Sequence, residues 1–451
     1  MKLLKNALII TMNSRDEVYK KGDLLISNDK IVDIGNNLSE KYVKVDEVID
    51  LEGKILMPGL VNTHVHLSQQ LGRGVADDVD LLTWLTKRVW PYESSLDEED
   101  SYISSLACNL ELIKSGTTTF LEAGGQYVPQ MVKAVEKSGL RASLTKSVMD
   151  IGEGLPEKWR LGVESEIKIQ RELLDKYHNT CDGRVKIWLG LRTIFNNSKE
   201  LILETKKLAD EYNTGIHMHI AEIEQEVKFC KEKNGETTVS FLNSLGVLDK
   251  NLLAVHTVWL TKEEIELFKK HDVKVSHNPA AAMKVTLGFA KVPEMLQMGI
   301  PVSIGTDGAP SNNRMDMMRE IYLTSLIHKG RTLDSKSVPA YEVLKMATIY
   351  GAKSALLEKE IGSLEIGKKA DLIILKKDTI HSLPTYDTIG NIVYSMSSEN
   401  VESSMCNGKW LMRDRKVLTI DESEIILKLK EHQIKIEEKL NLKLESKYNM
   451  I

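Results

Sequence analysis

Two histidines one residue apart, His64 and His66, close a run of apolar and β-branched residues with the sequence LVNTHVH. If this run is a β-strand, the alternation of side chains places both imidazoles on the same side, where they can hold one metal ion. A pair of this kind is weak evidence alone. Further ligands elsewhere in the chain are needed before the pair predicts a metal site.

Other apolar runs also carry imidazole or carboxylate side chains near their ends. These residues are His217, His219, Glu222, His256, His277 and Asp307. Single members have structural interpretations: His217 could be a core histidine, His277 could cap the turn before Pro279, and Asp307 could cap a helix. The repetition of the pattern over five runs favours one shared site over separate structural roles.

The chemistry of this residue set is that of a catalytic metal. Imidazole and carboxylate are ligands for zinc or ferrous iron, and the chain has no C-x-x-C pair to supply thiolates. Three histidines and Asp307 leave a position for water, whose pKa a bound metal lowers towards neutrality. Glu222 and His256 would then transfer protons, because neither is needed as a ligand. The residues alone leave both His217 and His219 as candidates for the third histidine ligand.

The elements that must position these residues are eight β-type runs. They cover residues 60–66, 117–124, 141–150, 185–192, 215–222, 252–259, 273–279 and 301–308. Most of the gaps hold an amphipathic helical pattern, such as residues 101–115 and 198–212. This alternation predicts an α/β protein with a (β/α)₈ TIM-like barrel, whose active site lies at the carboxyl ends of the strands. The alternative is an open doubly wound sheet, but no G-x-G-x-x-G motif follows a strand to indicate dinucleotide binding.

Short strand-like segments occur at both ends of the chain, separated by the barrel pattern. We therefore expect the two ends to form one small β-sandwich domain with the barrel as an insert. The expected division is 1–57 and 361–420 for the β-sandwich, 58–360 for the metal-dependent barrel, and 421–451 for a C-terminal helix.

Composition excludes several other classes of protein. The chain has 451 residues and a formal net charge of −5, which argues against nucleic acid or an anionic membrane as a partner. No stretch approaches the ~20 apolar residues that span a bilayer, and the N-terminus lacks a signal-peptide pattern. Cys108, Cys181, Cys230 and Cys406 are spaced as reduced thiols usually are, so we expect a cytoplasmic location.

Six segments have a more distinctive pattern: PGLVNTHVHL, LGRGVADDVDLLTWL, VWPYE, HIAE, SHNPAAAMK and GTDGAPSNN. Together they resemble the amidohydrolase superfamily over nearly the whole chain. The most similar branch contains the S-adenosylhomocysteine/methylthioadenosine deaminases and the triazine chlorohydrolases.

The resemblance implies a role for each residue of the candidate site. It implies one divalent metal ion, Zn²⁺ with Fe²⁺ as the alternative, bound by His64, His66, His219 and Asp307. It thereby selects His219 over His217. Glu222 would protonate a ring nitrogen, while His256 and Asp307 would orient and deprotonate the attacking water. The fourth run ends in GLR, with no Lys or Glu in a convincing bridging position, which favours one metal over two.

The same resemblance indicates residues for substrate binding. Trp84 and Glu93 match positions that adenosine-type deaminases of this branch use, and the Glu would hold ribose hydroxyls. Lys146 stands where the branch that binds a homocysteine carboxylate has an Arg. Arg192 and His277 are further candidates for substrate contacts.

Two departures make the substrate pocket different from that of the branch. A Pro-His-Ser-Pro stretch after the fourth strand is replaced by RTIFNNS, and Ala281 and Ala282 replace polar residues. A purine, pterin, pyrimidine or triazine amine is therefore as plausible a substrate as a thioether nucleoside.

We expect a hydrolase that acts on C–N bonds of cyclic amidines. It would remove the amino group from a small heteroaromatic substrate and release ammonia by attack of metal-bound hydroxide. The alternative on the same metal site is a triazine-type chlorohydrolase or N-dealkylating hydrolase. A non-catalytic scaffold is disfavoured because every ligand position is filled, and a cytidine-deaminase-type site is rejected because H-x-E and P-C-x-x-C are absent. A homo-oligomer is expected.

Overall fold

The computed structural model describes residues 1–79 and 83–440. Its main feature is a set of parallel strands that follow one another in chain order around a ring. The ring positions are filled by β6 (Leu60–Val65), β7 (Thr117–Glu122), β8 with β9 (Arg141–Leu144 and Ser147–Val148), β10 with β11 (Val185–Ile187 and Leu189–Leu191), β12 (Ile216–Ile220), β13 (Leu252–His256), β14 (Lys274–His277) and β15 (Val302–Ile304).

Two strands of the ring are each broken into two short pieces, but hydrogen bonds connect the ring across these breaks. Its third and fourth positions are each split into two short strands, and the N–H of Trp188 donates to the carbonyl of Leu144 at 2.9 Å across the break. The last strand returns to the first, since the N–H of Asp307 donates to the carbonyl of His64 at 2.8 Å. This hydrogen bond also joins two of the candidate metal ligands directly.

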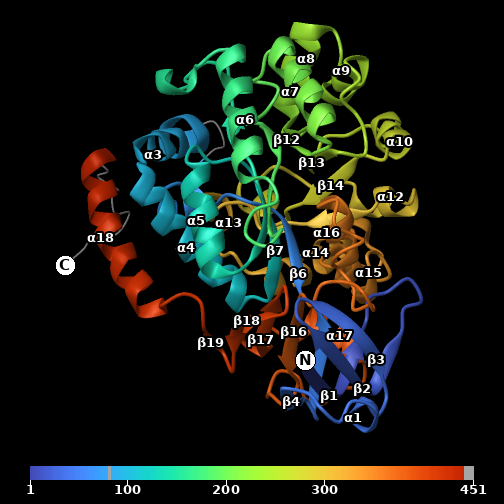
Figure 1. The fold of residues 1–451 in the computed structure, drawn as a ribbon. Helices are drawn as coiled ribbons and strands as arrows, with labels where there is room; N and C mark the ends of the chain where they lie inside the picture. The colour runs from blue at the N-terminus through green and yellow to red at the C-terminus, as the bar shows by residue number, and fades with distance from the viewer. Residues whose placement is uncertain (80–82, 441–451) are drawn as a thin grey trace, which may run out of the picture.

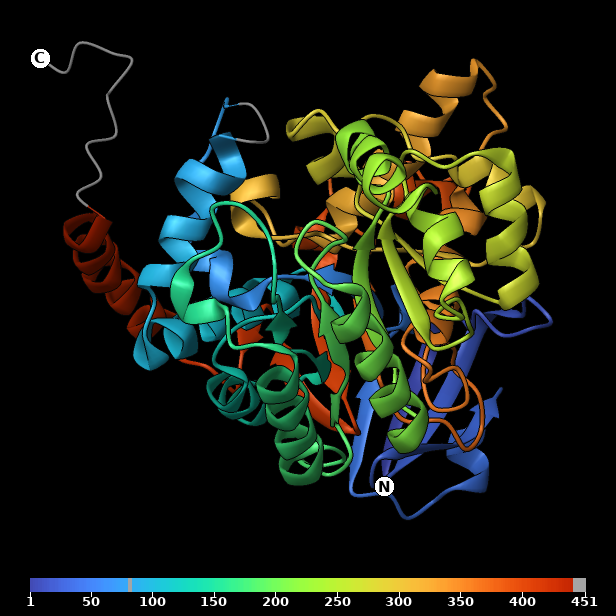
Figure 2. The same ribbon diagram turned by 90° about the horizontal axis from the view of Figure 1, so that it is seen from above.

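Helices pack around the outside of the strands, as Figure 1 and Figure 2 show from two directions. The principal helices of this layer are α4 (Glu98–Lys114), α5 (Val128–Ser138), α6 (Val163–Tyr177), α7 (Lys199–Tyr212), α8 (Glu224–Asn234), α9 (Thr238–Ser244), α10 (Lys262–His271), α12 (Val292–Gln297), α14 (Met317–Thr332), α15 (Ala340–Met346) and α16 (Ile349–Ser354). Shorter segments lie after strand ends: the 3-10 helix η1 (Leu67–Gly72), the π-helix η2 (Trp84–Val89), α3 (Trp90–Ser95), α11 (Pro279–Lys284) and α13 (Ala309–Asn312). The expected α/β barrel class is confirmed.

The two ends of the chain form a second sheet beside the barrel (Figure 1). Its strands are β1 (Lys2–Ile10), β2 (Val18–Ser27), β3 (Lys30–Gly35), β4 (Glu47–Asp50), β5 (Lys54–Pro58), β16 (Leu372–Lys376), β17 (Val401–Cys406), β18 (Lys409–Arg413) and β19 (Lys416–Val417). The two halves meet where β5 pairs antiparallel with β16. Hydrogen bonds link all nine strands into one sheet, which has register shifts within β1.

Alternation along β5 explains how this sheet serves two cores. Ile55 and Met57 pack into the large core that continues into the barrel, while Leu56 packs into a separate core with residues of β1, β2, β16 and β17. Successive side chains point to opposite faces of a strand, so one short strand contributes to both cores.

A buried ion pair fastens the barrel to the second sheet. The guanidinium of Arg141, on β8, donates to both carboxylate oxygens of Asp371 at 2.9 and 3.2 Å, and also to Asn407. Both charged side chains are almost fully buried. Burial makes the pair costly to break, because the remaining charge would have no counter-ion.

We expect Asp371→Asn to lower the free energy of unfolding by about 3–5 kcal/mol, the usual cost of leaving one partner of a buried pair uncompensated. Denaturant or thermal unfolding measures this change. Glu211→Gln is the matched control, because Glu211 pairs with Arg171 on the surface and should give no measurable change. Equal losses in both variants would contradict the structural role of the buried pair.

The C-terminal helix α18 (Glu422–Leu440) lies at the outer edge of the molecule in Figure 1 and contacts α4 and α3. His432 lies 2.7 Å from Asp100 of α4, and Lys439 donates to the other oxygen of the same carboxylate. The expected helix ran to residue 451, but residues 441–451 lie outside the described residues.

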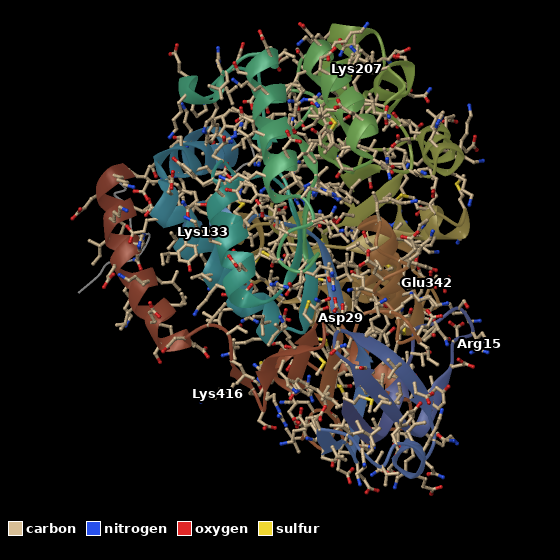
Figure 3. All side chains as sticks on the ribbon, viewed as in Figure 1. Arg15, Asp29, Lys133, Lys207, Glu342 and Lys416 are labelled. Atoms are coloured by element: carbon tan, nitrogen blue, oxygen red, sulfur yellow. The ribbon has the colours of Figure 1, made fainter. Side chains whose placement is uncertain are left out.

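The placement of charged side chains and the state of the cysteines agree with what the composition predicts. Charged side chains spread over the outside of both domains, as Lys133 on α5, Lys207 on α7 and Lys416 on β19 illustrate (Figure 3). None of the helices in residues 1–79 and 83–440 combines the length and apolar character that a bilayer crossing needs. All four cysteines are unpaired, and the cytoplasmic location stays a prediction.

Candidate metal centre and active site

Three strand ends bring imidazoles and a carboxylate together. His64 and His66 come from β6 and the residue after it, His219 from β12, and Asp307 from the segment after β15. Ligand atoms of His64, His66 and His219 lie within 4.8 Å of one another, and those of His64, His256 and Asp307 form a second such group. Asp307 Oδ1 lies 3.5 Å from His64 Nε2 and 3.7 Å from His66 Nε2.

The outer nitrogens of two of these rings are already engaged. His64 Nδ1 lies 2.9 Å from Nε2 of His217, and His219 Nδ1 lies 2.9 Å from the carbonyl oxygen of Arg192. Partners of this kind fix ring orientation and leave the other nitrogen for a metal. His217 is therefore placed behind a ligand rather than among the ligands.

Burial determines the charge of these groups. It lowers the pKa of His64 and lowers the pKa values of His66 and His219 further, so their rings are neutral at pH 7, the form that binds metals. Burial alone would raise the pKa of Asp307, but the neighbouring histidines, His64 first, bring it well below its usual range. The set therefore consists of neutral imidazoles and one carboxylate.

This donor set fits a divalent metal ion. His64 Nε2 is buried and has no hydrogen-bond partner among the described residues, which is costly for a polar atom unless something else binds it. Three imidazole nitrogens and a carboxylate oxygen are ligands that zinc and ferrous iron accept.

Glu222 and His256 lie beside this group. His256 Nε2 is 3.6 Å from Glu222 Oε1 and 4.0 Å from Asp307 Oδ2. Asn278 donates to His256 Nδ1 at 3.1 Å and accepts from Ser276, so its amide orientation is fixed and Nε2 of His256 points towards the carboxylates. Burial, followed by the charge of Asp307, raises the pKa of Glu222 to about 7. A carboxyl group with this pKa can donate a proton near neutral pH.

The backbone at these strand ends takes an unusual conformation. Ala221, His256, Thr257 and Asp307 have φ values of 50°, 67°, 52° and 64°, in the left-handed region that residues with a Cβ seldom adopt. Such conformations cost free energy and persist where surrounding contacts impose them. Here they turn the chain sharply after the strand and direct the polar side chains to one place.

A second buried acid, Glu226 on α8, holds the segment that carries Glu222. Its two carboxylate oxygens accept the N–H groups of Ala221 and Glu222 at 2.8 and 2.9 Å. No sequence motif marked Glu226, although its position one helical turn after Glu222 is a signal of a residue that caps this turn.

We expect Glu226→Gln to lower kcat by about 10-fold. The NH₂ group of the glutamine would face one of the two backbone N–H donors, so that hydrogen bond would be lost and Glu222 would be held less firmly. The substrate KM and the metal content should stay unchanged. Steady-state kinetics and metal analysis measure these quantities, with the exposed Glu232→Gln on the same helix as the control. Loss of metal in Glu226→Gln would show that Glu226 supports the ligands instead.

A cavity of about 660 Å³ opens above the candidate metal ligands, within the size range of small-molecule sites. His66, His219, Glu222, His256 and Asp307 line its polar end. Trp84 also lines it, with its indole N–H donating to the carbonyl of Pro310 at 3.4 Å. The structure thus brings three of the four predicted metal ligands, the proton-transfer residues and Trp84 to one cavity, while His64 does not line it.

Arg192 lines the same cavity and also a narrow side pocket. Three arginines are buried among the described residues; Arg141 and Arg184 have hydrogen-bond acceptors, whereas the guanidinium of Arg192 has none within the described part of the protein. Its charge acts on Glu222, but no described carboxylate forms an ion pair with it, so this side chain is available to a bound molecule.

The other predicted substrate residues are placed differently. Glu93 accepts a hydrogen bond from Gln69 at 2.9 Å and lines the side pocket beside Arg192. Lys146 forms a buried ion pair with Glu166 at 2.7 Å and lines neither space. His277 contacts His328 of α14 and is likewise not among the lining residues. Of the five predicted substrate residues, Trp84 and Arg192 line the cavity, Glu93 lines the side pocket, and Lys146 and His277 line neither.

The model of the amidohydrolase family matches residues 55–411. The chain belongs to the amidohydrolase family. This amidohydrolase is 44% identical over 427 residues to a 5′-deoxyadenosine deaminase of Methanobrevibacter smithii, covering 94% of this chain and 96% of that protein. It is 38% identical over 424 residues to a 5-methylthioadenosine/S-adenosylhomocysteine deaminase of Thermoanaerobacter pseudethanolicus, with coverage of 94% and 96%.

Solved structures of other proteins share its fold. An adenosine deaminase from Xanthomonas campestris with bound zinc superposes with a TM-score of 0.92 and 25% identity, covering 97% of this chain and 98% of that chain. An atrazine chlorohydrolase from Arthrobacter aurescens complexed with zinc gives a TM-score of 0.90 at 24% identity, with coverage of 96% and 100%. At that identity the second likeness supports the fold alone.

Proposed function

We propose that this amidohydrolase is a metal-dependent hydrolytic deaminase of an adenosine-type nucleoside, which releases ammonia. The observation that carries the proposal is the placement of Glu222 beside the His64, His66, His219 and Asp307 group at the polar end of the cavity. A proton donor next to a metal centre is what hydrolytic deamination of a heteroaromatic ring requires.

The choice of substrate class rests on the relatives. The two relatives described above are named as deaminases of adenosine nucleosides, and each aligns with almost the whole chain. The triazine-type chlorohydrolase or dealkylating hydrolase remains the second candidate, since the likeness to the atrazine enzyme is one of fold.

We assign the metal to His64, His66, His219 and Asp307, with zinc as the preferred ion and ferrous iron as the alternative. When bound, such an ion lowers the pKa of water and so supplies a nucleophile near neutral pH. Zinc is favoured because it is bound in the adenosine deaminase that shares this fold.

The protein residues carry the proton transfers. Glu222 donates a proton to the ring nitrogen next to the carbon that bears the amino group, which prevents negative charge from building up in the ring. His256 and Asp307 orient the attacking water, and the Asp307 carboxylate accepts its proton. Asp307 returns that proton to the amine, which leaves as ammonia, and the new hydroxyl gives its remaining proton to the Glu222 carboxylate and becomes the ring carbonyl.

Three residues are proposed to hold the substrate. Trp84 contacts the ring or sugar from the wall of the cavity, and the free donors of Arg192 bind an acceptor atom of the substrate. Glu93 binds sugar hydroxyls from the side pocket, which it shares with Arg192. Lys146 and His277 receive no substrate contact, because Glu166 and His328 are their partners.

An ammonia-release screen tests this function. The substrates are adenosine, 5′-deoxyadenosine, methylthioadenosine, S-adenosylhomocysteine, guanine, a pterin, cytosine and aminotriazines, each with and without a chelator. We expect ammonia from the adenosine nucleosides, and loss of that activity on chelation. Release of chloride or alkylamine from triazines, with no ammonia from any nucleoside, would favour the second candidate.

The expected homo-oligomer stays a prediction, which light scattering of the purified protein can test.

A further inference from the structure

The wall of the cavity changes character with distance from the metal ligands. Its polar end lies at the strand ends. The remaining wall comes from the segments above them and is largely apolar, with Leu85, Trp90, Ile151, Phe195, Ile223 and Phe229. Phe195 and Phe229 contact each other with ring centroids 4.9 Å apart. A substrate whose ring reaches Glu222 must therefore place its other end against this apolar wall.

The cations near the cavity are unsuited to binding a charged group at that end. Arg192 is the only buried lysine or arginine among the described lining residues, and its carbonyl oxygen lies 2.9 Å from Nδ1 of the proposed metal ligand His219, so it belongs to the ring end. Lys233 is exposed at the rim, where it lies over the Phe229 ring. An exposed cation of this kind binds a carboxylate only weakly.

The other buried lysine in this region is already neutralised. Lys146 Nζ lies 2.7 Å from Glu166 Oε2, and both side chains are buried. Glu166 lies on α6, in the helical layer outside the strands. Neither residue lines the cavity, so this pair offers no positive charge to a bound molecule.

We infer that the cavity selects adenosine-type nucleosides with an uncharged, apolar 5′ substituent and discriminates against a 5′ tail that carries a carboxylate. This inference rests on the proposed function and names its substrate class more narrowly. A carboxylate against the apolar wall loses hydration without gaining a partner. If the tail instead extends past the rim of the cavity, its carboxylate meets only a solvent-exposed cation, Lys233, and the apolar wall gains no contact with the substrate.

The test compares kcat/KM for four nucleosides: 5′-deoxyadenosine, 5′-methylthioadenosine, S-adenosylhomocysteine, and a neutral 5′-alkylthioadenosine whose chain is as long as that of homocysteine. The last compound separates the effect of length from that of charge. We expect S-adenosylhomocysteine to fall about 30-fold or more below the neutral analogue of equal length, as for a charged group that loses its partners.

The outcomes separate this inference from the function on which it rests. If the neutral nucleosides are deaminated and S-adenosylhomocysteine is used as well as the long neutral analogue, the inference is wrong and the function stands. If none of the four nucleosides releases ammonia, the proposed function fails.

A variant tests the same wall from the protein side. Phe229→Arg places a cation on the apolar wall, and Phe229→Met is the matched uncharged control. We expect the ratio of kcat/KM for S-adenosylhomocysteine to that for the long neutral analogue to rise about 10-fold in Phe229→Arg and to stay unchanged in Phe229→Met. An unchanged ratio in a Phe229→Arg protein that is folded by thermal unfolding would contradict the placement of the 5′ group at this wall.

Discussion

The Glu222→Gln variant is expected to lose about 10³-fold in kcat, within the range that general acid–base catalysis contributes. Glutamine occupies the same volume but cannot donate a carboxyl proton to the ring nitrogen. Because Glu222 is not one of the four proposed ligands, the variant should keep its metal and its fold. Single-turnover kinetics, metal analysis and thermal unfolding measure these three properties.

Glu224→Gln is the matched control for this variant. Glu224 lies two residues further along, pairs with Lys228 on the surface of α8, and does not line the cavity. Its replacement should leave kcat unchanged. Full activity in Glu222→Gln would remove Glu222 from the chemistry.

The pH dependence follows from the same carboxyl group. Burial and Asp307 raise the pKa of Glu222 to about 7. A raised pKa means that the proton donor is present below that value and is lost as the pH rises through it, so kcat should fall on the alkaline side. The residual activity of Glu222→Gln should lack this alkaline decline, and a pH–rate profile of both proteins measures the difference.

Asp307→Ala is expected to lose both the metal and the activity, because it removes a proposed ligand and the proposed proton acceptor at once. Metal analysis and ammonia release should both fall to background. A ligand that binds the native state raises the melting temperature, so added zinc should stabilise the unaltered protein and leave Asp307→Ala unchanged. Asp334→Ala, at an exposed loop residue, is the control. Retention of a full equivalent of metal in folded Asp307→Ala would place the ion elsewhere.

Much of the candidate site could be predicted from the sequence because barrel chemistry collects at strand ends. His64, His66 and Asp307 each follow an apolar run, and parallel strands bring such ends to one face. The choice between His217 and His219 could not be made from alternation, since both lie on the same side of β12. It depends on the depth of each ring in the barrel, which places His217 behind His64.

The contacts around the site were less accessible to sequence reasoning. Glu226 and Asn278 act through hydrogen bonds whose partners are fixed only by the left-handed turns after β12 and β13. The expectation of Lys146 at the substrate rests on its match to an Arg of the resembled branch, and Lys146 lies inside the β-type run 141–150. That run is in fact split between β8 and β9, and the lysine pairs with Glu166.

Fold class could be predicted because apolar β-type runs alternate with helical patterns along the chain, and this order is independent of the details of each element. The breaks between β8 and β9 and between β10 and β11 could not, because each lies inside a continuous β-type run with no glycine or proline at the break. The linkage of the two chain ends into one hydrogen-bonded sheet depends on the pairing of β5 with β16, which no local pattern encodes.

The central claim is that one divalent metal ion at the His64, His66, His219 and Asp307 group enables deamination. The most direct measurement is a titration of the metal-free protein with zinc or ferrous iron, in which bound metal and ammonia release from 5′-deoxyadenosine are followed together. The account predicts that activity rises in proportion to bound metal and saturates at one ion per chain. Full activity in the metal-free protein, or saturation with no gain in ammonia release, would contradict it.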